Sequence, residues 1–373
     1  HLDGRSGSNR STLGHAQIAA QTDIDALKAW LARFLDTRTT FDSYRKESER
    51  LLLWATLELG KPLSSLTHED LLVYQRFLAD PQPAERWVMK AGRKRSRFDP
   101  DWRPFAGPLA PTSQRQAIII LNTMFSWLVN AGYLAGNPLS LSRQRQRKAK
   151  PRITRFLDDE LWLEVKTTIE TMPRETDRER EHFHRARWLF SLLYICGLRI
   201  SEVIDNSMGS FFCRRDSEGE ERWWLEITGK GDMTRLIPAT TELMVELTRY
   251  RRENGLSPFP ISSEPTPLLL PIGGKQRSLT RSAVHLIVKE AFNRTASRIR
   301  ERGVQFERLA HMVEDASAHW MRHTAGSNMA DSMDLRHVRD NLGHSSISTT
   351  NTYLHTEDDL RHKETEAKHR LGW

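Results

Sequence analysis

Apolar residues recur at the spacing of an α-helix along the first third of the chain. In the segment from about Asp23 to Leu35, one face carries Ile24, Leu27, Trp30, Leu31, Phe34 and Leu35, as expected for an amphipathic helix. Three further segments share this pattern: about 40–59, a segment from Thr67, and about 112–130. At Thr67 the hydroxyl can cap the helix while Asp70 reaches back to the preceding N–H. Together the four segments predict a helical domain over residues 20–140.

The pattern changes beyond residue 155. Helical spacing continues at 185–196, 201–203, 279–300 and 318–329, whereas apolar and polar residues alternate at 210–214, 222–228 and 233–237. Short alternating runs are typical of antiparallel strands. We therefore expect a mainly α fold with a small antiparallel β-sheet, in which residues 156–373 form a second domain. The first 19 residues, rich in Ser, Gly, Asn and Arg, are predicted to be a flexible tail.

The composition is basic and otherwise ordinary for a globular protein. The 373 residues include 56 Lys and Arg against 48 Asp and Glu, which gives a formal net charge of +8. Such a balance fits either a solvated basic surface or a polyanionic partner. No apolar run approaches the roughly 20 residues needed to span a bilayer, and two cysteines cannot form a disulfide framework. These features predict a cytoplasmic protein that does not enter a membrane.

Positive charge is concentrated in two stretches. Residues 141–155 form a predicted linker between the domains, and its cations, with no acidic residue among them, are Arg143, Arg145, Arg147, Lys148, Lys150, Arg152 and Arg155. Such dense like charges repel in water, whereas contacts with a DNA duplex release counterions and strengthen binding. We therefore expect the linker to follow DNA, through Arg145, Arg147, Lys148, Lys150 and Arg152. In the loop at 86–103, for Arg93, Lys94 and Arg95, a solvated surface and a phosphate contact both remain open.

Polar residues of the second domain carry the strongest functional signal. Arg199 and Glu202 lie in Gly-Leu-Arg-Ile-Ser-Glu, and Lys230 lies in a Gly-Lys-Gly turn between two predicted strands. The later members of the set are His319, Arg322, His344 and Tyr353. Gly197 permits a sharp turn that could aim Arg199 into a cleft. His319 and Arg322 are three residues apart and so share a helical face.

These groups match the needs of phosphodiester cleavage without a metal. The nonbridging oxygens must be neutralised, and the planar fork of arginine can bind two of them at once. A phenol is a poor nucleophile at neutral pH because its pKa is near 10, but nearby cations favour its anion. A lysine on a tight hairpin can protonate the departing hydroxyl.

The residues GLRISE, GKGDMTRLIP, HWMRHT and LGHSSISTTNTYLH, in this order and spacing, resemble the tyrosine recombinase, or phage integrase, family. The resemblance implies that Arg199 and Arg322 clamp the scissile phosphate and that Lys230 is the general acid. It further implies that His319 assists proton transfer, that His344 binds a nonbridging oxygen, that Tyr353 attacks, and that Glu202 orients Arg199.

The same resemblance implies a two-domain clamp around double-stranded DNA with a specific recombination site. The helical domain would then be the core-binding domain, and residues 156–373 the catalytic domain. A 3′-phosphotyrosyl intermediate, a Holliday junction and a homotetramer on DNA are expected, with a monomer or dimer when free. Neither ATP nor a metal should be needed. In a bacterial cell the DNA-bound protein would be associated with the nucleoid. Phage integration, transposon movement or resolution, and chromosome dimer resolution all remain open.

Three alternatives remain open at the level of sequence. A type IB topoisomerase would use the same chemistry to relax DNA without exchanging partners, and a non-catalytic DNA-binding protein could keep the fold. His319 and His323, four residues apart, could also ligate a metal. However, Trp320 stands where a metalloprotease helix needs Glu, so His323 is expected to lie on the helix surface or in packing.

Overall fold

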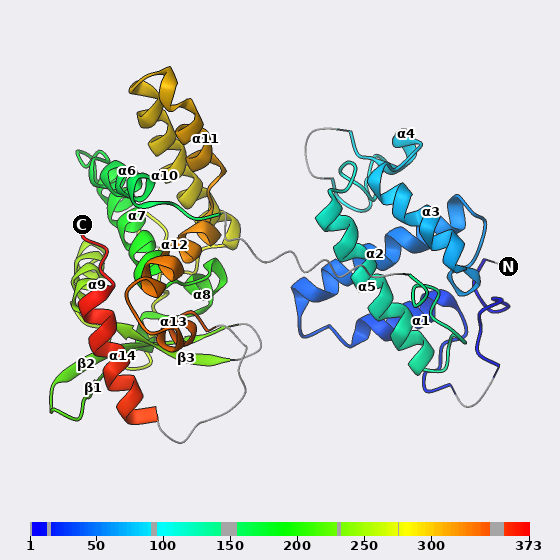
Figure 1. Cartoon of the computed structure of the whole chain (residues 1–373), viewed down its shortest axis with the longest axis horizontal. Coiled ribbons are helices and arrows are strands. Elements are labelled where there is room, and N and C mark those ends of the chain that lie inside the picture. The colour runs from blue at the N-terminus through cyan, green and yellow to red at the C-terminus, as the bar shows by residue number, and fades with distance from the viewer. Residues whose placement is uncertain are drawn as a thin grey trace. The chain divides into compact units, whose positions relative to one another are not determined.

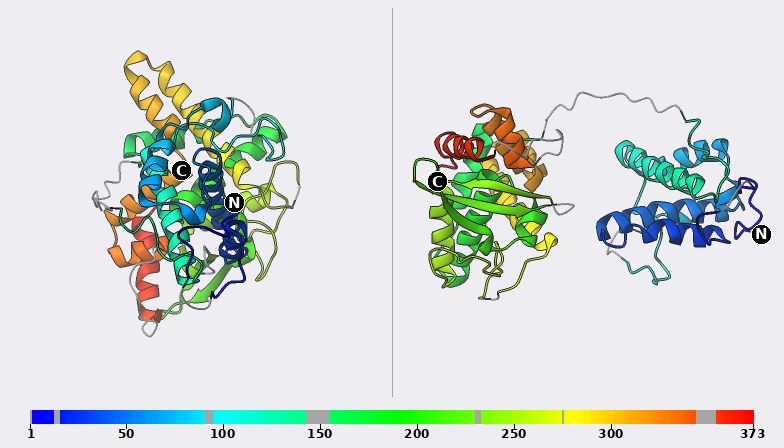
Figure 2. Two further views of the ribbon diagram at one scale, coloured as in Figure 1. Left: turned by 90° about the vertical axis from the view of Figure 1, so that its right-hand side faces the viewer. Right: turned by 90° about the horizontal axis from the view of Figure 1, so that it is seen from below.

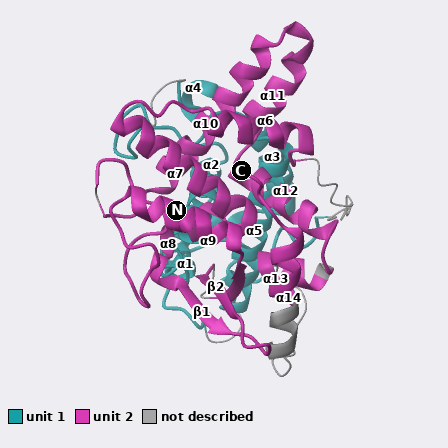
Figure 3. Cartoon of the chain, turned by 90° about the vertical axis from the view of Figure 1, so that its left-hand side faces the viewer, with its two compact units in different colours: residues 1–148 teal, residues 149–373 magenta. Residues whose placement is uncertain are grey.

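The computed structural model describes residues 2–12, 16–90, 95–142, 155–229, 233–274, 276–343 and 354–373. The chain divides into two compact units, residues 1–148 and 149–373 (Figure 3). Among the described residues of unit 1 the regular elements are helices, in the order α1 (Asp23–Ala32), α2 (Arg38–Leu57), η1 (Leu63–Ser65), α3 (His68–Ala79), α4 (Ala84–Trp87) and α5 (Pro111–Asn130). This agrees with the helical region predicted from apolar spacing, although α1 ends three residues earlier than expected and α4 was not foreseen.

The core of unit 1 is rich in aromatic residues that the helical spacing brings together. Trp30 of α1 stacks on Tyr44 of α2 with ring centroids 5.2 Å apart, and Trp54 packs against Tyr74 at 5.0 Å. At the start of α3, Thr67 and Asp70 form the capping box that the sequence predicts, because each side chain accepts from the other's backbone N–H. Local spacing therefore placed this helix start and most of the core stripe, although Ile24 and Leu35, expected on the apolar face, are 50% and 65% exposed.

The first residues of the chain do not form the free tail expected from their composition. Asn9 donates its backbone N–H to the Ser64 carbonyl at 2.8 Å, and its side-chain amide donates to the Gly136 carbonyl at 2.8 Å. The guanidinium of Arg10 lies 3.9 Å from the centroid of the Tyr133 ring. Residues 2–12 are thus part of unit 1, and contacts with distant residues hold them there.

Unit 2 is a mixed fold of helices around a three-stranded antiparallel sheet with the order β1-β2-β3 (Figures 1 and 2). Its elements are α6 (Asp159–Glu170), α7 (Asp177–Ile195), α8 (Ile200–Asp205), η2 (Met208–Ser210), β1 (Phe211–Arg215), β2 (Glu221–Thr228), β3 (Thr234–Ala239), α9 (Thr241–Glu253), α10 (Arg281–Glu301), η3 (Val304–Phe306), α11 (Glu307–Asp315), α12 (Ala318–Ala330), α13 (Leu335–Leu342) and α14 (Leu354–Lys368). The three strands lie within two residues of the alternating runs in the sequence. The predicted fold class, mainly α with a small antiparallel sheet, is confirmed.

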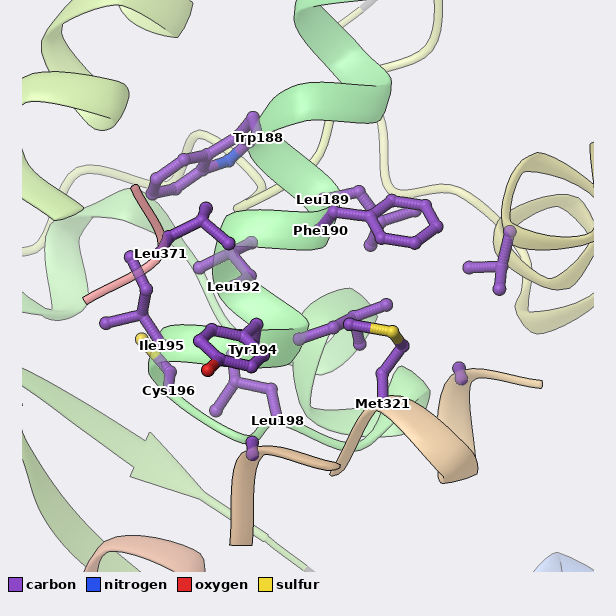
Figure 4. Close-up of a cluster of buried hydrophobic side chains, with 14 of the residues drawn as sticks. Trp188, Leu189, Phe190, Leu192, Tyr194, Ile195, Cys196, Leu198, Met321 and Leu371 are labelled. Carbon is purple, nitrogen blue, oxygen red and sulfur yellow. The ribbon is translucent and has the colours of Figure 1, made fainter. Parts of the chain in front are cut away.

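Helix α7 forms the centre of the unit 2 core. From Trp188 to Ile195 every side chain is buried, as expected for a helix that is apolar on all sides. It packs against α6, α9, α10 and α12. Met321 of α12 and Leu371 of the C-terminal segment reach the same cluster (Figure 4). This packing holds the end of α7 in place, and the first residues of the candidate site follow directly from it.

The C-terminal residues also pack onto unit 2. Leu371 is buried, His369 stacks on the ring of Tyr194, and the Trp373 indole donates to the Ser191 hydroxyl at 3.1 Å. Among the described residues no helix is long and apolar enough to cross a membrane.

Candidate active site

The site begins at the turn that follows α7. Gly197 has a φ of +58°, a left-handed conformation that side chains other than glycine adopt only with strain. The turn places Arg199 at the N-cap of α8. The expected sharp turn before Arg199 is therefore confirmed. Its side chain is 41% exposed, so the guanidinium remains accessible from solvent.

Glu202 accepts hydrogen bonds from two arginines. The Arg199 Nη1 donates to Oε1 at 2.8 Å, and the Arg199 backbone N–H donates to Oε2 at 2.9 Å. Arg235 of β3 donates Nη1 to Oε1 at 2.8 Å and Nη2 to Oε2 at 2.9 Å. Burial alone would raise the pKa of Glu202, but these donors outweigh it and lower the pKa to about 2. Glu202 is therefore an ionised carboxylate, although its side chain is only 2% exposed.

Arg322 of α12 joins two backbone segments that are distant in sequence. Its guanidinium donates to the carbonyl of Gly197 and to the carbonyl of Leu342. The residue is 4% exposed. Burial, together with the charge of Arg199, lowers the pKa of Arg322 to about 10, so it remains a cation at neutral pH. The two arginines are thus close enough for their charges to interact at the Gly197 turn.

His319 lies one turn before Arg322 on α12 and contacts His323. The two Nε2 atoms are 3.0 Å apart, so one imidazole donates to the other. Burial, followed by the charges of Arg322 and Arg199, lowers the pKa of His319. The pKa of His323 is lowered by burial, His319 and Arg322. Both rings therefore bind a proton less readily than a free imidazole does, and His323 contacts a residue of the site as well as lying on the helix surface.

Three of the predicted residues, Lys230, His344 and Tyr353, lie outside the described residues. For each of them, a residue directly before or after it in the sequence is described. The Gly229 N–H donates to the Met233 carbonyl at 2.9 Å across the β2–β3 turn. Gly343, with a φ of +62°, ends α13 directly before His344. Helix α14 begins at Leu354, directly after Tyr353.

The structure brings together four of the predicted side chains, namely Arg199, Glu202, His319 and Arg322. It also adds Arg235, which the sequence reasoning missed, and His323, which that reasoning had considered only as a metal ligand or as a surface or packing residue. Arg235 could have been noticed because it lies in the predicted strand that follows the Gly-Lys-Gly turn with the site candidate Lys230. For His323, the signal was the i, i+4 spacing to His319.

The DNA-contact candidates are only partly described. Arg95 lies in an exposed loop and donates to the Asp99 carboxylate at 3.1 Å, so its charge is partly compensated. Arg93, Lys94, Arg145, Arg147, Lys148, Lys150 and Arg152 lie outside the described residues. Arg155, the last cation of the predicted linker, is described, and its charge contributes to the lowered pKa of His319. Within the described part of the chain, no three His, Cys, Asp or Glu side chains are grouped to hold a metal ion.

Arg199, Arg322 and His319 together form a cationic group that can bind an anion. Comparison with known proteins shows to which family the chain belongs. The model of the phage integrase family matches residues 164–359, which includes every one of these residues. The chain belongs to this family and is a tyrosine recombinase, an enzyme of site-specific recombination.

Curated relatives cover most of the chain. Tyrosine recombinase XerD of Rickettsia conorii is 24% identical over 82% of this chain and 92% of its own length. Tyrosine recombinase XerC of Agrobacterium fabrum is 25% identical over 88% of this chain and 89% of its own length.

Solved structures share the fold. The XerH recombinase in a pre-cleavage complex with its difH substrate has a TM-score of 0.55 and 15% identity, covering 94% of this chain and 91% of XerH. The Tn1549 transposon integrase with transposon right end DNA has a TM-score of 0.52 and 15% identity, covering 90% of this chain and 98% of that one.

Proposed function

We propose that the protein cleaves and rejoins DNA at a specific site through a covalent bond to Tyr353. The phenol oxygen attacks the scissile phosphorus, a 3′-phosphotyrosyl link forms, and the DNA 5′-hydroxyl leaves. Attack by the 5′-hydroxyl of a partner strand reverses the step and leads through a Holliday junction. The new link conserves the energy of the phosphodiester, so the reaction needs neither ATP nor a metal.

The observation that carries this proposal is the meeting of Arg199 and Arg322 at the Gly197 turn. Two guanidiniums there can neutralise the nonbridging oxygens as charge develops in the transition state. Among the described residues, the Arg199 guanidinium has no hydrogen-bond partner other than Glu202, which leaves donors for a phosphate.

The remaining roles follow from the chemistry of each group. Lys230 protonates the departing 5′-hydroxyl, His344 donates to a nonbridging oxygen, and Tyr353 is the nucleophile. His319 assists proton transfer, which a neutral imidazole can do as either donor or acceptor.

The partner that we propose is double-stranded DNA; the XerH structure holds its difH substrate and the Tn1549 integrase structure holds transposon right end DNA. Unit 1 would be the core-binding domain, residues 141–155 a basic linker along the duplex, and unit 2 the catalytic domain. Strand exchange would take place in a homotetramer, as four strands must be cleaved and rejoined. The protein would act in the bacterial cytoplasm, on the nucleoid.

A suicide substrate tests the covalent step. DNA nicked beside the cleavage point loses a short fragment after attack, so the protein–DNA adduct is trapped and visible on a denaturing gel. Tyr353→Phe should bind the same DNA and give no adduct. Tyr44→Phe is the matched control, because Tyr44 packs with Trp30 and Phe34 in unit 1, and it should give the wild-type amount. An adduct with Tyr353→Phe would assign the nucleophile to another residue.

A plasmid with two copies of the bound site separates recombination from relaxation. A recombinase yields deletion or inversion products, according to the orientation of the sites. A type IB topoisomerase would change only the supercoiling. A non-catalytic binding protein would yield neither product nor adduct.

A further inference from the structure

Arg235 of β3 connects three segments of the site. Its Nη1 and Nη2 donate to the two oxygens of Glu202 at 2.8 and 2.9 Å, and its Nε donates to the Asn341 carbonyl at 3.0 Å. The side chain is 12% exposed. The fork therefore faces into the protein, and it fixes the carboxylate of α8 relative to the end of α13.

The hydrogen-bond capacity of Glu202 is fully used. Each carboxylate oxygen accepts one hydrogen bond from Arg199 and one from Arg235, and a carboxylate offers about four lone-pair positions. Arg199 therefore has a single side-chain bond to Glu202. If Arg235 were absent, both oxygens would have free positions, and Arg199 could turn into a bidentate pair with the carboxylate.

The charges lead to the same conclusion. Glu202 is ionised and almost completely buried, and it lies between two cations. One anion with two guanidiniums leaves one net positive charge, which is at the exposed Arg199. Without Arg235, Glu202 would neutralise Arg199 and would weaken its attraction for a phosphate.

We propose that Arg235 is a positioning residue for DNA cleavage. It occupies half of the Glu202 carboxylate, and in this way it keeps Arg199 directed and available to the scissile phosphate. The inference rests on the proposed role of Arg199 in binding that phosphate. Arg235 itself contacts no reacting atom.

The chain offers a matched control in Arg251 of α9. It donates Nη1 and Nη2 to the two oxygens of Glu264 at 2.9 and 3.1 Å, and Nε to the Ser257 carbonyl at 2.7 Å. The fork and the Nε bond match those of Arg235, but the pair holds the loop after α9, and Nη2 also donates to the Ser257 hydroxyl at 3.2 Å and to the Phe259 carbonyl at 3.4 Å. A substitution there gives an upper value for what the loss of such a fork costs in folding, away from the site.

The test is the first-order rate of adduct formation on the suicide substrate, with enzyme in excess and DNA saturated. Arg235→Gln should lower this rate by roughly 10- to 100-fold, within the range seen when a transition-state donor is misplaced, while the Kd for DNA stays within about threefold. Arg235→Lys should recover part of the rate, because it keeps the charge but not the fork. Arg251→Gln should lower the melting temperature and leave the rate of the folded enzyme unchanged.

A double-mutant cycle with Glu202→Ala shows whether Arg235 acts through the carboxylate. In that background Arg235→Gln should change the rate by less than about threefold, since residues that act as one unit are not additive. An equal loss in both backgrounds, or a wild-type rate for folded Arg235→Gln, would overturn the inference. If the wild-type enzyme itself formed no adduct, the proposed function would fail instead. If the Gln variant does not fold, the rate of adduct formation by Arg235→Lys serves as the test instead.

Discussion

Both units bury carboxylates, and two of them, Asp23 of unit 1 and Glu202 of unit 2, differ in what holds them. In unit 1, Asp23 is 1% exposed and accepts from the Tyr133 hydroxyl at 2.8 Å and from the Ser64 N–H at 3.0 Å. In unit 2, Glu202 is 2% exposed and accepts from two arginines. Burial, and then Asp23 itself, raises the pKa of Tyr133, so the phenol remains a neutral donor.

Asp23 is held by neutral donors and acts as a structural anchor, whereas Glu202 is held by charged donors. Neutral donors satisfy the Asp23 carboxylate, while its backbone N–H donates to the Asp3 carbonyl at 2.8 Å and so links it to the N-terminal residues. These donors carry no positive charge. Arginine donors satisfy Glu202 equally well and leave one cation in excess beside Gly197. We infer that removal of the first anchor affects folding, whereas removal of the second affects the reaction.

The largest effect should come from Glu202→Gln. The amide keeps the size of the side chain but cannot accept four hydrogen bonds, so Arg199 and Arg235 lose their common partner. We expect the rate of adduct formation to fall by roughly 100-fold, comparable to the loss of one transition-state donor. Single-turnover cleavage of the suicide substrate measures this. A rate within threefold of wild type would remove the distinction between the two carboxylates.

A smaller effect, on stability only, is expected for Tyr133→Phe. The change removes one of the two donors to buried Asp23, which typically costs about 1–3 kcal/mol. Urea unfolding followed by fluorescence measures the loss, which should be confined to the unfolding of unit 1. The adduct-formation rate at saturating DNA should not change, and a large fall in that rate would make Asp23 more than a structural anchor.

The smallest effect concerns how strongly the positive charge of Arg199 changes the pKa of His319. Burial, followed by the charges of Arg322, Arg199 and Arg155, lowers the pKa of His319, so the folded protein disfavours the imidazolium. The stability that this provides is present above the unfolded pKa of about 6.5, and it is lost as pH falls from there through the folded pKa. Arg199→Gln should raise the pKa of His319 towards its ordinary value, whereas Tyr133→Phe should not. Histidine NMR titration measures both, and an unchanged pKa in Arg199→Gln would assign the shift to burial, Arg322 and Arg155.

Features encoded by neighbouring residues could be predicted from the sequence. The turn at Gly197, the N-cap position of Arg199 and the capping box of Thr67 with Asp70 each depend on a few adjacent positions. Strand alternation placed the sheet for the same reason. Helix α9 was missed because the charged Glu246 and Arg251 lie on its buried face. Helix α6 was missed although its buried residues Leu161, Trp162, Val165 and Ile169 have helical spacing.

Features that depend on distant partners could not be predicted. Arg235 lies 33 residues from Glu202 and 106 from Asn341, and no periodicity links them. The N-terminal residues resembled a tail because their partners, such as Ser64 and Gly136, are far along the chain. In both cases a polar side chain is explained by an acceptor that only the tertiary fold supplies.

The two hydrogen bonds that Arg322 donates to the carbonyls of Gly197 and Leu342 have a consequence for engineering. A chimera that takes α7 and α8 from one recombinase and α13 from another joins two backbone segments which evolved against different guanidinium positions. Because one side chain sets the spacing of both, a working exchange would have to transfer α12 together with them, as a single cassette.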